Sequence, residues 1–128
     1  MRLLLDTHAF LWFIMGDSRL SSAARAAIEN PADEKLLSVG SLWEMAIKVS
    51  LGKLTLAEPF PQIIPRELKR NGFQLLPMSL AHASHVSSMP FHHRDPFDRL
   101  LVAQAMEESL VVLSADTHFD LYGIKRFW

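Results

Sequence analysis

Short apolar segments alternate with segments of helical periodicity along most of this chain. The apolar run Leu3–Leu5 ends at Asp6, and the apolar positions of Thr7–Met15 recur at helical intervals, which predicts a strand followed by a helix. Further strands are predicted at residues 36–39, 73–76 and 110–113, with a fifth at 124–127 on the sheet edge. Short apolar strands of this kind are typical of a sheet that is buried on both faces.

Capping and helix-ending residues mark the segments between these strands. Ser21 precedes a run of strong helix formers that ends at Asn30–Pro31, and Asp95–Pro96 supplies an N-cap followed by proline at the first helical position. Helices are predicted at residues 21–29, 41–50, 63–70, 79–87 and 95–108, with a loop at 90–94. Strands alternating with helices indicate an α/β fold with a parallel sheet.

The size and composition are those of one packed domain. A chain of 128 residues with 49% hydrophobic and 21% charged residues is long enough for a single core, so we expect one domain spanning 1–128. The formal net charge is -1, and any binding to a polyanion must therefore depend on a local basic patch.

The chain contains no cysteine, which excludes disulfides, thiolate catalysis and cysteine-based zinc sites. Asp6 and His8 interrupt the apolar start and no small-residue cleavage site follows, so we expect no signal peptide. No apolar run approaches the roughly 18 residues of a membrane span. These features together predict a soluble, cytoplasmic protein with no membrane partner.

Four acidic residues follow or adjoin the ends of predicted strands. Asp6 ends the first strand, Glu44 lies in the helix after the second, Asp98 in the first turn of the long helix and Asp116 just beyond the fourth strand. We expect all four at the carboxyl edge of the sheet, where α/β folds bind ligands. Crowded carboxylates call for a cation, and an all-oxygen set favours Mg²⁺, with Mn²⁺ as the alternative. Hydrolysis of a phosphate ester is the chemistry that such a site supports.

Each acid also has a structural interpretation. The spacing Ser41–Glu44 fits a capping box, Asp95 is a good N-cap, and the helix dipole favours Asp98. Asp6 could cap the first helix, and Asp116 could form an Asx turn. These interpretations explain each acid separately, but they do not explain why all four acids are expected at the same edge of the sheet.

Histidine and basic residues are weaker candidates. His82 and His85 have i,i+3 spacing that could serve zinc, although no third ligand is near them in the sequence. The segment His92–Arg94 is expected at the rim of the site, where it could contact phosphate. Arg94 and Arg99 lie close to the acids in the sequence, and together with Lys48 they are the predicted contacts to the phosphate of a substrate.

Apolar residues in the early helices exceed what a small α/β domain is expected to bury. Phe10, Trp12, Phe13 and Met45 are the main examples. We expect them to form a helical face through which two copies of the chain associate as a homodimer.

Two other functional classes fit poorly. A phosphatase of the haloacid dehalogenase type needs a second aspartate two residues after the first, where this chain has His8. A Rossmann-type nucleotide-binding module needs a glycine-rich phosphate turn, and neither G-x-G-x-x-G nor a P-loop occurs.

Four segments, in order, resemble the PIN-domain proteins of the VapC group of toxins, and the likeness runs from residue 3 to about 126. The segments are Leu4-Leu5-Asp6-Thr7-His8, Ser41-Leu42-Trp43-Glu44, Arg94-Asp95-Pro96-Phe97-Asp98-Arg99 and Ser114-Ala115-Asp116. The resemblance implies a three-layer α/β/α fold with a five-stranded parallel sheet. It also implies Mg²⁺-dependent endoribonuclease activity, homodimerisation and inhibition by a small VapB-like antitoxin.

The resemblance further assigns roles to individual residues. Asp6 and Asp98 correspond to the principal metal ligands, and Glu44 and Asp116 complete the acidic pocket, with Asp116 as a further metal ligand. Thr7 and Ser114 correspond to supporting hydroxyls, and Asp95 is a neighbour of the site. An arginine or lysine of the antitoxin could reach these carboxylates. The alternative is a non-catalytic PIN scaffold, which the presence of all four acids disfavours.

Overall fold

Three consecutive leucines in the first strand divide the hydrophobic core in two. In the computed structural model, which describes residues 1–128, Leu3 and Leu5 of β1 (Arg2–Leu5) point into one cluster of buried residues and Leu4 into another. This alternation follows from the two-residue period of a strand. Because neither side of β1 is solvated, both faces of the sheet carry helices.

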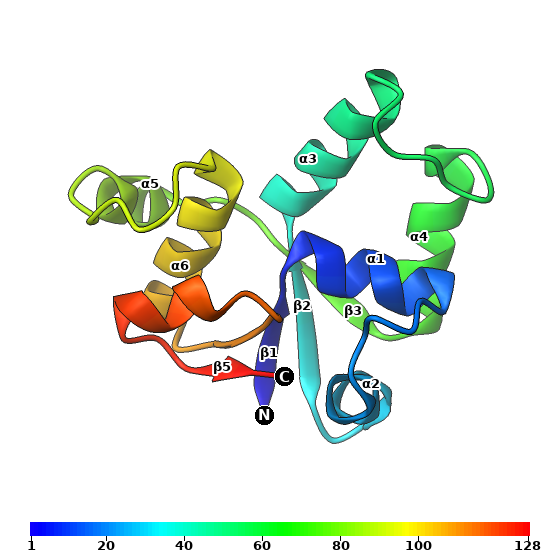
Figure 1. Cartoon of the computed structure of the whole chain (residues 1–128), viewed down its shortest axis with the longest axis horizontal. Coiled ribbons are helices and arrows are strands. Elements are labelled where there is room, and N and C mark those ends of the chain that lie inside the picture. Colours follow the sequence, from blue (N-terminus) through cyan, green and yellow to red (C-terminus); the bar gives the residue numbers. More distant parts are fainter.

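Five parallel strands form the sheet in the order β3-β2-β1-β4-β5 (Figure 1). The other strands are β2 (Glu34–Ser38), β3 (Phe73–Leu76), β4 (Val111–Leu113) and β5 (Arg126–Phe127). Leu5 is level with Leu37 on one side and with Leu113 on the other, so these three strands end within one residue of each other. The residues that follow them therefore meet at one edge.

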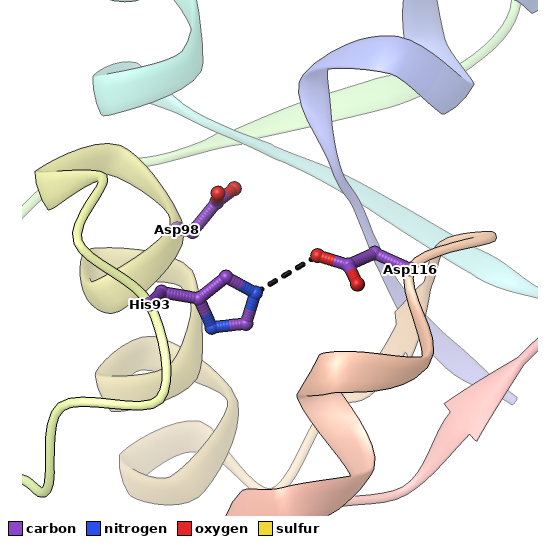
Figure 2. A group of neighbouring side chains, drawn as sticks. All are labelled: His93, Asp98 and Asp116. Carbon is purple, nitrogen blue, oxygen red and sulfur yellow. Dashed lines mark hydrogen bonds and ion pairs between the residues drawn. The ribbon is translucent and has the colours of Figure 1, made fainter.

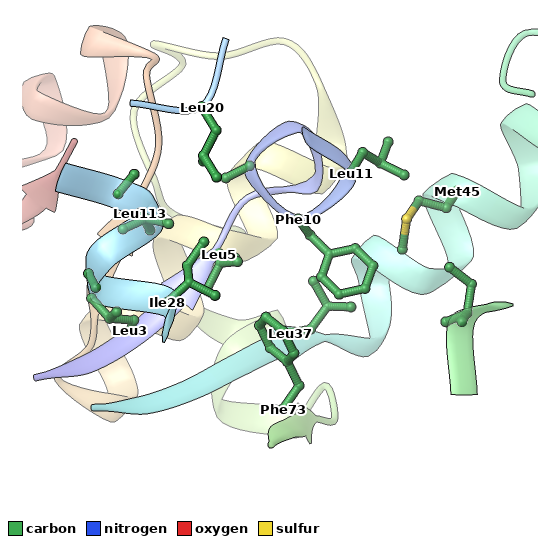
Figure 3. Packing of buried hydrophobic residues seen from close by; sticks show 14 of the residues in the cluster. Leu3, Leu5, Phe10, Leu11, Leu20, Ile28, Leu37, Met45, Phe73 and Leu113 are labelled. Atoms are coloured by element: carbon green, nitrogen blue, oxygen red, sulfur yellow. The ribbon is translucent and has the colours of Figure 1, made fainter. Parts of the chain in front are cut away.

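The helices form two layers, one on each face of the sheet. They are α1 (Thr7–Met15), α2 (Ser22–Glu29), α3 (Val39–Ser50), α4 (Phe60–Arg70), α5 (Leu80–Val86) and α6 (Pro96–Glu108), with a 3-10 helix η1 (Thr117–Tyr122). Helices α1 to α4 enclose the cluster around Leu5, Phe10 and Phe73 (Figure 3), whereas α6 and η1 cover the cluster around Leu4. The predicted three-layer α/β/α fold is confirmed.

Several boundaries differ from those predicted. Helix α3 begins at Val39 because the side chain of Ser38 accepts a hydrogen bond from the Gly40 N–H. Helix α4 begins at Phe60, before the predicted start, because Pro61 lies in the first turn, where no N–H is needed. The 3-10 helix was not predicted, and the fifth strand contains only two residues.

The predicted dimer face is wrong in its central residues. Phe10 and Met45 are 0% exposed, since they fill the cluster beneath α1 and α3. Trp12 and Phe13 are half-buried against the same cluster. This domain therefore buries more of its early helices than its size suggested.

None of the helices combines the length and the apolar character needed to cross a membrane.

Candidate active site

Asp6 follows β1 at the carboxyl edge of the sheet and is 7% exposed. One carboxylate oxygen accepts a hydrogen bond from the Ala9 N–H at 2.8 Å, so Asp6 is the N-cap of α1. The other oxygen accepts a hydrogen bond from the Ser114 hydroxyl. Burial raises the pKa of Asp6, although these two hydrogen bonds act in the opposite direction. The charged form of the Asp6 carboxylate is therefore stabilised by these two hydrogen bonds and not by contact with water.

Glu44 joins the same edge from α3. Its Oε1 accepts a hydrogen bond from Thr7 Oγ1 at 2.6 Å, and its Oε2 lies 2.8 Å from Lys48 Nζ. The capping-box interpretation is wrong, because Ser38 is the N-cap and the buried Ser41 hydroxyl has no hydrogen-bond partner. The carboxylate of Glu44 is therefore available to the acidic edge and is held there by Thr7 and Lys48.

Asp98 lies in the first turn of α6, three residues after the N-cap residue Asp95. Asp95 is the N-cap of this helix, as predicted, and accepts hydrogen bonds from the Phe97 and Asp98 N–H groups. Burial raises the pKa of Asp98 to about 7, and the negative charges of Asp95, Glu44 and Asp6 add to this effect. Burial is the main cause of this shift, and the smaller contributions of Glu44 and Asp6 indicate that carboxylates from other segments of the chain lie near Asp98.

His93 enters the pocket between Asp98 and Asp116 (Figure 2). Its Nε2 lies 2.8 Å from Asp116 Oδ2, and its side chain is only 8% exposed. One ligand atom from each of the three residues falls within 4.8 Å of the others. The sequence had placed the His92–Arg94 segment at the rim, so the position of His93 is a correction.

Asp116 follows β4 and is the N-cap of η1, as the Asx-turn interpretation anticipated. Its Oδ1 accepts a hydrogen bond from the His118 N–H at 2.9 Å. Partial burial raises the pKa of Asp116, but hydrogen bonds with His93 and His118 outweigh it and leave the pKa below its usual value. The Asp116 N–H also donates to Ser114 Oγ at 3.0 Å, which links this residue to the hydroxyl that holds Asp6.

Arg99 does not fit the predicted contact with RNA. It is 6% exposed, and its guanidinium donates to the carbonyls of Val86, Met89 and Pro90. Arg94 is exposed and adjoins His93 in the sequence, and Lys48 forms an ion pair with Glu44, so these two remain candidate contacts to phosphate.

The two histidines of α5 are directed to different glutamates and not to a shared point. His82 Nε2 lies 3.0 Å from Glu108 Oε1, and its Nδ1 accepts a hydrogen bond from the Ser79 N–H. His85 Nδ1 lies 2.8 Å from Glu107 Oε1. Both side chains therefore connect α5 to the end of α6, which does not fit the zinc interpretation.

An apolar cavity is distinct from the acidic pocket. It has a volume of about 440 Å³ and is lined mainly by apolar residues of α3, α5 and α6, among them Val39, Trp43, Val86 and Leu100. No titratable side chain lines it, so it lacks the groups that hydrolysis requires. The acidic edge, with its oxygen donors and one imidazole, has the composition of a divalent-cation site.

Comparison with known proteins identifies the family. The model that describes PIN domains matches residues 3–125. The chain belongs to the PIN-domain family. Ribonuclease VapC16 of Mycobacterium tuberculosis (strain ATCC 25618 / H37Rv) is 38% identical to this PIN domain over 61 residues. That similarity covers 48% of this chain and 43% of the relative, so it spans less than half of either protein.

Solved structures share the fold of this PIN domain at low sequence identity. VapBC2 from Rickettsia felis, bound to a DNA fragment from its promoter, superposes with a TM-score of 0.74 at 12% identity, over 99% of this chain and 98% of the other. DNA-bound VapBC from Salmonella typhimurium gives 0.72 at 18% identity, over 99% and 97%. FitAcB from Neisseria gonorrhoeae gives 0.65 at 17% identity, over 98% and 96%.

Proposed function

We propose that this PIN domain is a metal-dependent endoribonuclease, the toxin of a VapBC-type toxin–antitoxin pair. The observation that carries the proposal is geometric: carboxylates that follow β1 and β4 and that lie in α3 and α6 meet at one edge of the sheet. The raised pKa of Asp98, caused mainly by burial, agrees with this crowding. A pocket that gathers this much negative charge requires a compensating cation. The similarity to Ribonuclease VapC16 supports RNA as the substrate.

We assign the metal ligands to Asp98, Asp116 and Asp6, with Glu44 acting directly or through water. Carboxylate oxygens are the donors preferred by Mg²⁺ and Mn²⁺, so the donor set fits such an ion. When bound, the ion would supply a water of lowered pKa and positive charge for the phosphodiester. Asp6 and Glu44 would then accept the proton of the attacking water or orient it.

The hydroxyls and the lysine around the acids have supporting roles in this proposal. Thr7 fixes one oxygen of Glu44 and Lys48 the other, which keeps this carboxylate aimed at the pocket. Ser114 contacts both the carboxylate of Asp6 and the N–H of Asp116, and in this way it holds these two acidic residues close to each other. Arg94 and Lys48 are the proposed contacts to RNA phosphate.

The proposed partners are a VapB-like antitoxin and a second copy of this chain. Two of the similar structures are VapBC assemblies, and an antitoxin arginine or lysine would neutralise the acidic pocket. Exposed apolar side chains near the cavity of α3 and α5, such as Trp43 and Met78, are better candidates for the dimer contact than Phe10 and Met45.

The test is cleavage of a mixed RNA pool with Mg²⁺ or Mn²⁺, in the wild type and in Asp6→Asn. Asparagine keeps the shape of Asp6 but removes its charge, so we expect cleavage to fall by at least about a hundredfold with the fold retained. The matched control is Asp33→Asn, which removes a carboxylate just before β2, at the opposite edge of the sheet.

Cleavage by the control should stay near that of the wild type. Intact RNA in every sample, or full activity in EDTA, would contradict the proposed function; the first result would favour a non-catalytic scaffold.

A further inference from the structure

His93 supplies the one imidazole nitrogen in the group of three donors that the acidic pocket brings together. It comes from the loop before α6, and one of its ring nitrogens lies within 4.8 Å of carboxylate oxygens of Asp98 and Asp116 (Figure 2). With its side chain only 8% exposed, it is more completely buried than Asp116. The metal site outlined above consists of carboxylates alone and gives this ring no role.

We propose that His93 is a direct nitrogen ligand of the metal ion, together with Asp98 and Asp116, and that it biases the site toward Mn²⁺ over Mg²⁺. The inference rests on the proposed function as a metal-dependent nuclease. It changes the coordination from all-oxygen to mixed nitrogen and oxygen.

The ring is held in the orientation that ligation requires. Tyr122 of η1 stacks on it with an interplanar angle of 8°, and the Tyr122 hydroxyl lies 3.2 Å from His93 Nδ1. The same hydroxyl oxygen accepts a hydrogen bond from the backbone N–H of His93 at 2.9 Å. Metal-binding histidines characteristically have their second ring nitrogen fixed by such a partner. Tyr122 is therefore a positioning residue that directs Nε2 into the pocket.

The spacing of the donor atoms suits one shared ion. With ligand bonds of about 2.1 Å, adjacent donors of an octahedral ion are about 3.0 Å apart and opposite donors about 4.2 Å. The His93 Nε2 and Asp116 Oδ2 atoms are 2.8 Å apart, and the third donor lies within 4.8 Å. Metal binding would release the proton that lies between Nε2 and Asp116 and leave the ring proton on Nδ1, where the Tyr122 hydroxyl oxygen can accept it. Small side-chain movements would then make the two facing atoms adjacent metal ligands.

Imidazole ligation has a predictable effect on metal preference. Mg²⁺ is bound mainly by oxygen and gains little from nitrogen, whereas transition-metal ions accept imidazole readily. His118 also contacts Asp116, at Oδ1, but its side chain is 66% exposed and it lies outside the group of three donors. The alternative is that His93 only hydrogen-bonds Asp116 and never touches the ion.

The experiment is pulsed EPR of the full chain loaded with Mn²⁺ alone, since this method detects nitrogen bonded to the ion. We expect nitrogen coupling in the wild type and its loss in His93→Phe, which keeps an aromatic ring against Tyr122. The control His118→Ala removes the other histidine on Asp116 and should keep the coupling.

Metal affinities give a second readout. In His93→Phe we expect Mn²⁺ to bind roughly tenfold more weakly, with Mg²⁺ affinity within about threefold of the wild type. His93→Gln retains an amide that can hydrogen-bond Asp116, and it should lose Mn²⁺ affinity as His93→Phe does. Full Mn²⁺ affinity in His93→Gln would identify a positioning role instead.

The outcomes separate this proposal from the proposed function. Mn²⁺ that binds without nitrogen coupling, or with coupling that His118→Ala removes, overturns the ligand role of His93 and leaves the metal-dependent nuclease standing. Failure of the wild-type chain to bind Mn²⁺ or Mg²⁺ overturns both.

Discussion

At the scale of single residues, Asp98 carries the clearest physical consequence of the crowded acids. A carboxyl whose pKa is higher in the folded than in the unfolded chain binds more protons when folded. The pKa of Asp98 rises from 3.8 to about 7, chiefly through burial. The metal-free protein therefore loses stability as the pH rises through this interval, and the deprotonated pocket is the one that a cation stabilises.

Asp98→Asn should remove most of this pH dependence. In EDTA, we expect the wild type to lose on the order of 1 kcal/mol between pH 5 and pH 8, after allowance for partial solvent screening, and the variant to lose less. Thermal unfolding at the two pH values measures the difference. Added Mn²⁺ should raise the melting temperature of the wild type more than that of the variant.

If Asp98 were only a favourable residue at the helix N-terminus, the substitution would destabilise the protein at both pH values and leave the response to Mn²⁺ unchanged. That result would remove Asp98 from the site.

The acids of the site were predictable, whereas the histidine was not. Asp6 and Asp116 follow strands directly, so parallel topology alone brings them to one edge. His93 lies in a loop whose path depends on Tyr122, 29 residues later, and on a 3-10 helix with no apolar periodicity. Position in the sequence carries no sign of such contacts. The same limit explains why Arg99 was misassigned, since its partners are backbone carbonyls.

At the scale of elements, the strands and most helices could be predicted because each has a local cause. Apolar runs specify β1 and β2, and Asp95–Pro96 specifies the start of α6. The first turns of α3 and α4 could not be placed from the sequence. Ser38 also fits the end of a strand, and Pro61 also fits a loop. The segment between α5 and α6 has no regular structure, and Arg99 fixes its first part through hydrogen bonds to backbone carbonyls.

Arg99→Met should loosen this segment. Three carbonyls would lose a charged donor, so we expect the free energy of unfolding to fall by about 2–3 kcal/mol, as measured by denaturant titration. The free energy of unfolding of Arg99→Lys should lie between those of the wild type and Arg99→Met, because a single ammonium group cannot reproduce the forked geometry of the guanidinium. Amide hydrogen exchange at residues 87–94 should accelerate in both variants.

The control is Arg25→Met, which removes a solvent-exposed i,i+4 pair with Glu29 and should change stability little. Equal effects of the Arg25 and Arg99 variants would show that the carbonyl contacts do not hold the loop.

At the scale of the whole molecule, charge limits how this domain could bind the proposed RNA substrate. The formal net charge is -1, and the pocket itself is acidic, so no general attraction to a polyanion exists. Phosphate contacts must come from a few basic side chains at the rim. Lys48 is already bonded to Glu44, and Arg99 is buried, which leaves Arg94 as the exposed cation nearest in sequence to Asp98.

Affinity for single-stranded RNA should therefore depend only weakly on salt, and Arg94 should account for a measurable part of that dependence. Each phosphate contact contributes about -0.7 to the slope of log K against log salt concentration. We expect Arg94→Ala to make the slope shallower by about 0.7, in binding titrations with Asp98→Asn as the background so that RNA stays intact.

The matched control is Arg70→Ala, which removes an exposed arginine at the end of α4 and should leave the slope unchanged. A shallower slope in Arg70→Ala alone would place the RNA path over α4 and away from the acidic edge. A steep slope that neither variant alters would mean that RNA follows a basic surface that includes neither Arg94 nor Arg70.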